Sequence, residues 1–144
     1  MNRIAKTIAL GLICIAGAAA AKDGVTNPVV KARMDTMGAV RGNVAILGDM
    51  ASGKTVYDQA AATAAQAALA AAAAEVTAKF QPQETDPVSE AKPEIWTSWD
   101  DFATKADALA KAAVALDASS LDGVKTGMGA VGGTCKACHS VYRL

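Results

Sequence analysis

The sequence predicts an all-α fold, namely an antiparallel up-down-up-down four-helix bundle. Alanine dominates the 52% of residues that are hydrophobic, whereas aromatic residues make up only 4%, and alanine is the best helix former. Apolar side chains recur at three- and four-residue steps in four segments, separated by links that contain proline, glycine or serine. In 144 residues, four such helices can bury their stripes only against one another, and short links make sequential neighbours antiparallel.

The first helix is expected at about residues 28–49. Asn27 offers an N-cap, and Pro28 suits the first helical position because its missing N–H would have no helical partner there. Gly48 and Gly53 then interrupt the helical pattern. The inward stripe of this helix comprises Val30, Met34, Met37, Val44 and Leu47, with Arg41 as an interruption.

The second helix is expected at residues 58–80, an alanine-rich run without glycine or proline. Its inward stripe comprises Leu69, Ala73, Val76 and Phe80. Residues 81–93 include Pro82, Pro87 and Pro93, and they are expected to form a loop because proline cannot propagate a helix.

The third helix is expected at about residues 99–117, beginning at a capping box formed by Ser98 and Asp101. Its inward stripe comprises Phe102, Ala106, Leu109, Ala113 and Leu116. The fourth helix follows Ser119-Ser120 and continues to the C-terminus. Its stripe keeps an unbroken 3-4-3-4-3-4-3 spacing through Leu121, Val124, Met128, Val131, Cys135, Cys138 and Tyr142.

Residues 1–21 have the form of an export signal, which leaves residues 22–144 as a single domain. Arg3 and Lys6 precede an apolar run from Ile8, and small residues up to Ala21 suit cleavage near Ala20 or Ala21. The apolar stretch is shorter than the roughly 18–20 residues that span a bilayer. We therefore expect a bacterial periplasmic protein whose mature chain does not insert into the membrane.

The charge balance argues against nucleic acid as a partner. Lys and Arg number 14, and Asp and Glu also number 14. A phosphate backbone is held by a basic field, and a chain without net positive charge does not supply one.

Cys135-Lys136-Ala137-Cys138-His139 spells C-x-x-C-H, the attachment signature of c-type haem. On a helix, the two thiols and the imidazole share one face because they stand three or four residues apart. That placement suits two thioether bonds to one porphyrin and an axial bond from His139 to its iron. His139 is the only histidine, which excludes bis-histidine ligation and a separate Ser-His-Asp triad. We expect one covalent haem c per chain and no enzymatic activity.

Three other interpretations are disfavoured. A thioredoxin-type C-x-x-C pair opens a helix after a strand, whereas this pair lies near the C-terminus. A structural zinc site needs four Cys or His ligands, and the mature chain contains three. Residues 48–55 fit the P-loop pattern G-x-x-x-x-G-K-[ST], but the sequence offers no parallel sheet around them. We interpret that segment as a turn between the first two helices.

The segment Cys135–Arg143, C-x-x-C-H-x-x-Y-R, resembles the C-terminal signature of class II c-type cytochromes, the cytochrome c prime family. The resemblance covers the whole mature chain, including the proline-rich link with Ile95-Trp96. It implies that Arg143 lies beside the proximal imidazole. It also implies that Arg33 pairs with a haem propionate and that Met37, four residues later, covers the distal haem face. The family often has glutamine directly after that arginine, where this chain has Met34, so no propionate contact is assigned to position 34.

Two functions remain open at this level. Met37 as sixth iron ligand would make the protein a low-spin carrier of single electrons between redox partner proteins, because Met/His ligation raises the reduction potential. An open sixth position would make it a five-coordinate haem protein that binds nitric oxide or carbon monoxide, as the resemblance also allows. A peroxidase would need a polar distal acid–base group, and no second histidine supplies one. The resemblance further permits a homodimer packed through the first two helices.

Overall fold

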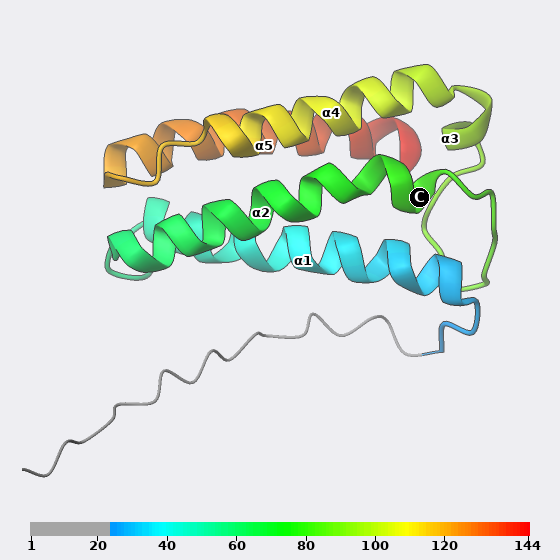
Figure 1. Ribbon diagram of the computed structural model, residues 1–144, viewed down its shortest axis with the longest axis horizontal. Coiled ribbons are helices and arrows are strands. Elements are labelled where there is room, and N and C mark those ends of the chain that lie inside the picture. The colour runs from blue at the N-terminus through cyan, green and yellow to red at the C-terminus, as the bar shows by residue number, and fades with distance from the viewer. Residues whose placement is uncertain (1–23) are drawn as a thin grey trace, which may run out of the picture.

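Five helices form in the part of the chain that the computed structural model describes, residues 24–144. They are α1 (Pro28–Ala51), α2 (Gln59–Phe80), α3 (Glu94–Thr97), α4 (Trp99–Ala115) and α5 (Leu121–Tyr142). The four long helices run up, down, up and down beside one another (Figure 1), which confirms the all-α bundle expected from the sequence. The signal peptide expected at residues 1–21 lies outside the described residues, and the 22–144 domain boundary stays a prediction.

Side-chain caps fix where three of the long helices begin. The Asn27 side chain accepts hydrogen bonds from the backbone N–H groups of Val29 and Val30, at 2.9 and 3.2 Å. Asp58 caps α2 through the N–H of Ala61 at 2.7 Å. In the same way, Ser120 caps α5 through Gly123 at 3.0 Å. These bonds satisfy N–H groups that have no partner within the helix.

The capping box expected at Ser98 and Asp101 is wrong. The Ser98 side chain makes no cap hydrogen bond to α4, because Ser98 also ends α3, where its N–H donates to the carbonyl of Glu94 at 2.9 Å. Its backbone angles (φ −126°, ψ 45°) lie outside the extended region typical of an N-cap. The unexpected helix α3 has only four residues, too few for an apolar period to reveal it.

The turn after α1 has no phosphate-binding architecture. α1 continues through Gly48 to Ala51, and Gly53 takes the left-handed conformation (φ +76°) that glycine adopts without strain. The Lys54 ammonium pairs with the Asp49 carboxylate at 3.1 Å. Within residues 24–144, no β-strand precedes this segment, in agreement with the interpretation as a turn.

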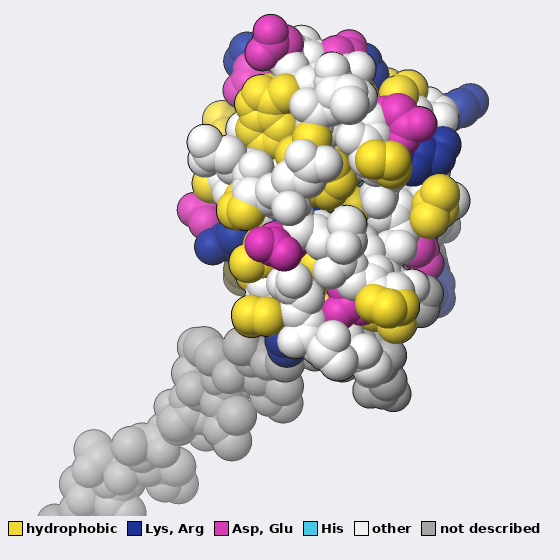
Figure 2. Space-filling view, turned by 90° about the vertical axis from the view of Figure 1, so that its right-hand side faces the viewer, with side chains coloured by type: hydrophobic (Ala, Val, Ile, Leu, Met, Phe, Trp, Pro, Cys, Tyr) yellow, Lys and Arg dark blue, Asp and Glu magenta, His cyan; other side chains and the backbone are white. Residues whose placement is uncertain are grey.

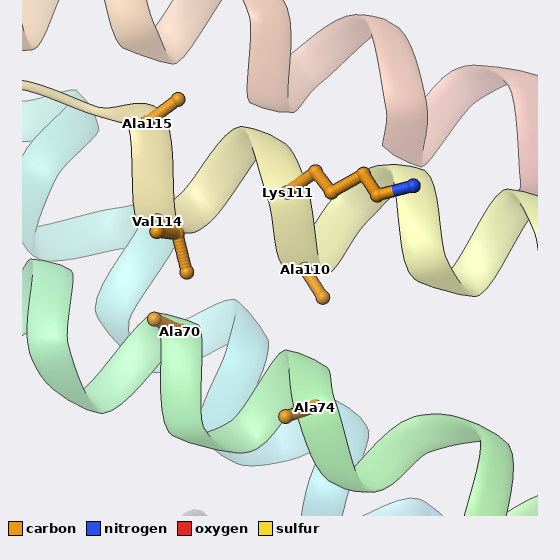
Figure 3. Close-up of a pocket in the computed structure, with 6 residues that line it drawn as sticks. All are labelled: Ala70, Ala74, Ala110, Lys111, Val114 and Ala115. Carbon is orange, nitrogen blue, oxygen red and sulfur yellow. The ribbon is translucent and has the colours of Figure 1, made fainter.

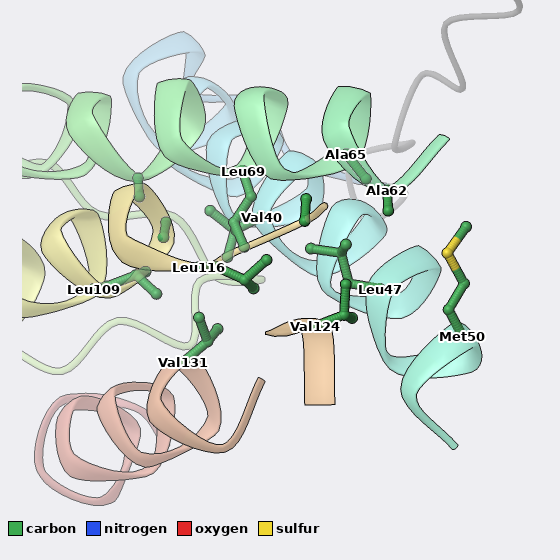
Figure 4. Close-up of a cluster of buried hydrophobic side chains, with 13 residues drawn as sticks. Val40, Leu47, Met50, Ala62, Ala65, Leu69, Leu109, Leu116, Val124 and Val131 are labelled. Atoms are coloured by element: carbon green, nitrogen blue, oxygen red, sulfur yellow. The ribbon is translucent and has the colours of Figure 1, made fainter. Parts of the chain in front are cut away.

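The core divides into two clusters along the bundle. The larger cluster is aliphatic and is centred on Leu47, Leu69, Val124 and Val131, each fully buried (Figure 4). The smaller cluster lies toward the end that carries α3 and consists of Val76, Phe80, Ile95, Phe102, Ala106 and Tyr142, with Met37 and Cys138 packed against it. The predicted inward residues of the second and third helices are all buried.

α1 differs from its predicted stripe. Arg33 and Val40 are buried, at 2% and 6% exposure, whereas Met34, Met37 and Val44 are only partly buried. The reason is that α1 faces two environments, the aliphatic core near its C-terminal half and a cavity along its middle.

The surface at the α3 end intersperses acidic, basic and hydrophobic side chains (Figure 2). Within residues 24–144, no helix combines the length and apolar character needed to cross a membrane.

Candidate functional site

A cavity of about 600 Å³ brings all six predicted site residues together. Its volume lies within the range of roughly 300–1,000 Å³ typical of small-molecule and cofactor sites. α1 contributes one wall and the last turns of α5 contribute another, while side chains from α2, α3, α4 and residues 88–91 complete the lining. The predicted residues on its surface are Arg33, Met37, Cys135, Cys138, His139 and Arg143.

Met37 on α1 and His139 on α5 lie at about the same level along the bundle. Gly48 lies beside Met128, because a Cβ at Gly48 would be in ordinary van der Waals contact, at 3.8 Å, with the Met128 methyl. Met37 precedes Gly48 by eleven residues, and His139 follows Met128 by eleven. α1 and α5 are antiparallel, and each rises about 1.5 Å per residue. Because both residues stand eleven positions from the Gly48–Met128 contact, they lie at about the same level along the bundle. Both line the cavity.

Cys135 and Cys138 are half-buried free thiols on the cavity side of α5. Burial is the main cause that raises the pKa of both thiols, so both are protonated at neutral pH. A thioredoxin-type pair has the opposite property, a pKa lowered by a helix N-terminus. The direction of the shift therefore argues against a thioredoxin-type pair of reactive thiolates.

His139 is held in its neutral form beside them. Burial, and secondarily the charge of Arg143, lower the pKa of His139, and a neutral imidazole is the form that binds metal. Within the described part of the chain, no three His, Cys, Asp or Glu side chains gather as a metal-binding cluster. A neutral imidazole on the cavity surface can supply one nitrogen ligand to a metal ion.

A network around Tyr142, which sequence reasoning missed, fixes the end of α5. The Tyr142 hydroxyl donates to the Asp101 carboxylate at 2.6 Å, and the Lys105 ammonium donates to the same group at 2.6 Å. The buried Tyr142 ring meets Phe102 edge-on, with centroids 5.4 Å apart. Asp101, expected as a helix cap, instead anchors the helix that carries His139.

Arg33 is 2% exposed and its guanidinium fastens the link after α2 to α1. It donates to the carbonyls of Lys79 at 3.3 Å and Glu84 at 2.9 Å, and to that of Pro82. The same group lies 4.9 Å from the centroid of the Trp96 ring. Burial lowers the pKa of Arg33. Three of its five N–H groups are thus engaged, and the propionate contact stays a prediction.

Arg143 closes the cavity beside His139 through a pairing with the proline-rich link. Its Nε and Nη2 atoms donate to Glu90 Oε2 at 2.7 and 2.5 Å. The backbone forms an antiparallel bridge with Ala91, flanked by a hydrogen bond from the Lys92 N–H to the Tyr142 carbonyl at 3.0 Å. Arg143 therefore lies near His139, and the link holds it there.

A second hollow, of about 290 Å³, lies between α2 and α4 (Figure 3). Its walls are alanines, Val114 and the stem of Lys111, whose ammonium pairs with Asp107 at 2.6 Å. None of these side chains can form a thioether, and the one nitrogen among them, the Lys111 ammonium, is paired with Asp107. The larger cavity is therefore the candidate cofactor site.

The lining of the larger cavity fits a haem. Apolar side chains make up most of its surface, two thiols lie one helical turn apart on one wall, and an imidazole follows them. A C-x-x-C-H segment that faces such a cavity is the signature of a c-type cytochrome, here carried on a helical bundle.

Comparison with known proteins identifies the family. The family model described as Cytochrome C' matches residues 28–143, and this chain belongs to that family. It is therefore a haem c cytochrome.

Relatives and solved structures agree with this membership. The chain is 33% identical over 116 residues to cytochrome c-556 of Agrobacterium tumefaciens, covering 78% of this chain and 92% of the relative. It is 32% identical over 151 residues to cytochrome c' of Cereibacter sphaeroides, covering 96% and 98%. The nitric oxide complex of a variant cytochrome c prime from Alcaligenes xylosoxidans superposes with a TM-score of 0.72 at 31% identity, covering 80% of this chain and 92% of that one.

Proposed function

We propose that this chain is a periplasmic carrier of single electrons that holds one covalent haem c with His139 and Met37 as axial ligands. The observation that carries the proposal is that Met37 on α1 and His139 on α5 line one cavity, at about the same level along the bundle by their residue counts from the Gly48–Met128 contact. Haem c, when bound, supplies one-electron redox chemistry at its iron.

The residues on the α5 wall would hold the group. Cys135 and Cys138 would each form a thioether bond, and His139 would donate a ring nitrogen to the iron. Tyr142 and Arg143, tied to Asp101 and Glu90, keep the last turn of α5 in place. A fixed imidazole supports electron transfer because little rearrangement accompanies the change of oxidation state.

Met37, on the α1 wall, would supply the sixth ligand of the haem iron. The Met37 side chain is partly buried and packs against the aromatic cluster that also contacts Cys138. A thioether is a neutral ligand that stabilises the reduced metal, so Met/His ligation raises the reduction potential. No substrate turnover is assigned to the protein.

The test is the spectrum of the purified holoprotein and of Met37→Leu. We expect a low-spin ferric spectrum with the near-infrared sulfur-to-iron band, and loss of that band in Met37→Leu. Met34→Leu is the matched control, because Met34 lines the same cavity one turn nearer the N-terminus, and it should keep the band. A high-spin ferric spectrum in the unmutated protein would contradict ligation by Met37.

The second candidate is a five-coordinate protein that binds nitric oxide or carbon monoxide. Similarity to a cytochrome c prime whose structure contains nitric oxide favours it. In that case Met37 would pack over the distal face without binding the iron. Rapid carbon monoxide binding by the unmutated ferrous protein would select this function over electron transfer.

Export, redox partner proteins and a homodimer through α1 and α2 complete the proposal. The intact mass of the mature protein tests export, with cleavage expected near Ala21. Retention of residues 1–20 in the isolated protein would contradict the periplasmic location.

A further inference from the structure

Glu90 and Arg143 form an ion pair on the surface of the cavity, next to His139. The Nε and Nη2 atoms of Arg143 both donate to Glu90 Oε2, at 2.7 and 2.5 Å. Both side chains line the cavity, as His139 does. The charge of Arg143 reaches the imidazole, because it is, after burial, the second cause that lowers the pKa of His139. The pair therefore brings two opposite charges close to the proposed iron ligand.

Main-chain bonds fix the place where these two side chains meet. Glu90 and Arg143 are 53 residues apart in the sequence, so no local spacing predicts the pair. Ala91 and Arg143 form an antiparallel bridge, and the Leu144 N–H donates to the Glu90 carbonyl at 2.9 Å. Because these bonds use backbone atoms alone, a substitution of the Glu90 side chain leaves the end of the chain in place. The charge of the pair can therefore be changed without unfolding the site.

A fixed charge near a redox centre shifts its potential, because ferric iron carries one more positive charge than ferrous iron. The Arg143 guanidinium alone would favour the ferrous form, and the Glu90 carboxylate alone would favour the ferric form. We propose that Glu90 is a positioning residue of the haem site, which holds the Arg143 guanidinium beside His139 and offsets its charge. The reduction potential then depends on the balance of the two charges. This inference rests on the proposed function, and it adds to the axial ligands a second determinant of the potential.

The expected effect is moderate, since solvent reaches both partners. The Arg143 side chain is 54% exposed and that of Glu90 is 39% exposed. Water and salt screen charges at such positions. The influence of either charge on the iron should therefore shrink as the ionic strength rises.

The test measures the ratio of ferrous to ferric holoprotein at one fixed applied potential. Glu90→Gln keeps the shape of the side chain and removes its negative charge, so the ratio should rise about three- to fivefold. Arg143→Gln removes the positive charge, so the ratio should fall by a similar factor. The double variant lacks both charges and should return to within about twofold of the unmutated ratio. Both single effects should shrink in about 1 M salt.

Further variants separate the charge of the pair from a structural role. Glu90→Asp keeps the carboxylate and should keep the ratio within about twofold of the unmutated value. Asp107 and Lys111 provide a matched control, because they form an ion pair at 2.6 Å on α4, outside the cavity lining. Asp107→Asn and Lys111→Gln should each change the ratio less than about 1.5-fold.

The outcomes distinguish this inference from the function on which it rests. Shifts of the two single variants in the same direction would overturn the proposal, and so would a double variant no nearer to the unmutated ratio than the single ones. Single shifts no larger than those of the control pair would overturn it as well. Absence of covalent haem from the unmutated protein would instead overturn the proposed function.

Discussion

The hydroxyl of Tyr142 donates a 2.6 Å hydrogen bond to the carboxylate of Asp101, and this bond joins the helix of the haem motif to α4. The bond to Asp101 is the main cause that raises the pKa of Tyr142 to about 12. In turn, hydrogen bonds from Lys105 and Tyr142 lower the pKa of Asp101. The two residues thus stabilise each other in one protonation state, with Tyr142 neutral and Asp101 charged.

The Tyr142–Asp101 bond predicts an alkaline loss of stability. Because the pKa of Tyr142 is raised from 10.0 to about 12, its contribution is complete below pH 10 and is lost as the pH rises through about 12. In Asp101→Asn, the Tyr142 pKa should move back toward 10, measured by tyrosinate absorbance. Tyr142→Phe should lower the free energy of unfolding at neutral pH and lack this alkaline step. An unchanged tyrosine titration in Asp101→Asn would contradict the coupling.

Asp86 predicts a separate loss of folding stability at acidic pH. Its carboxylate accepts hydrogen bonds from the N–H groups of Thr26, Asn27 and Val88, at 2.9, 3.0 and 3.1 Å. Backbone bonds, that from Asn27 first, lower the pKa of Asp86 from 3.8 to about 2. The stabilisation is therefore complete above pH 4 and lost as the pH falls to about 2.

Urea titrations of the unmutated protein and of Asp86→Asn check this step. The asparagine variant should be less stable by a constant amount above pH 4, and the difference should vanish near pH 2. Because Asp86 ties the proline-rich link to the start of α1, proteolysis near residues 81–93 should also become faster. A stability difference that persists unchanged to pH 2 would rule out the charged carboxylate as its source.

The parts of the site that the sequence predicts are those carried by local spacing. Cys135, Cys138 and His139 share a helix face through positions three and four apart, and the long helices follow from their apolar period. Arg33 could not be predicted as buried, because its charge is offset by carbonyls 46 to 51 residues away in the sequence. The same holds for Asp101, whose position suits a helix cap until Tyr142, 41 residues later, approaches it.

Gly127 predicts a steric limit in the packing of α5. A Cβ at this position would lie 2.5 Å from Leu116 Cγ, closer than real Cβ atoms come to a neighbour, and 3.1 Å from the Leu116 Cα, which is also tight. Gly127→Ala should therefore lower the free energy of unfolding by about 1–3 kcal/mol, the usual cost of overpacking. Gly129 on the same helix has nothing within 4 Å of such a Cβ. Gly129→Ala should raise the free energy of unfolding by about 0.5–1 kcal/mol. Equal effects of the two substitutions would contradict the packing of Leu116 against α5.

The last prediction concerns how the haem is held. Cys135 and Cys138 are half-buried, protonated thiols on one face of α5, and both line the cavity that also contains His139. Two thioether bonds from these positions would fix the porphyrin independently of its iron ligands. Denatured holoprotein should therefore keep all its haem through extraction with acidified organic solvent. The Cys135→Ala, Cys138→Ala double variant should release any haem that it binds. His139→Ala separates the two kinds of bond, because it should keep covalent haem after denaturation while losing the axial ligand, visible as a changed spectrum of the native protein. Haem that is extracted freely from the unmutated protein would show that the two cysteines do not attach it.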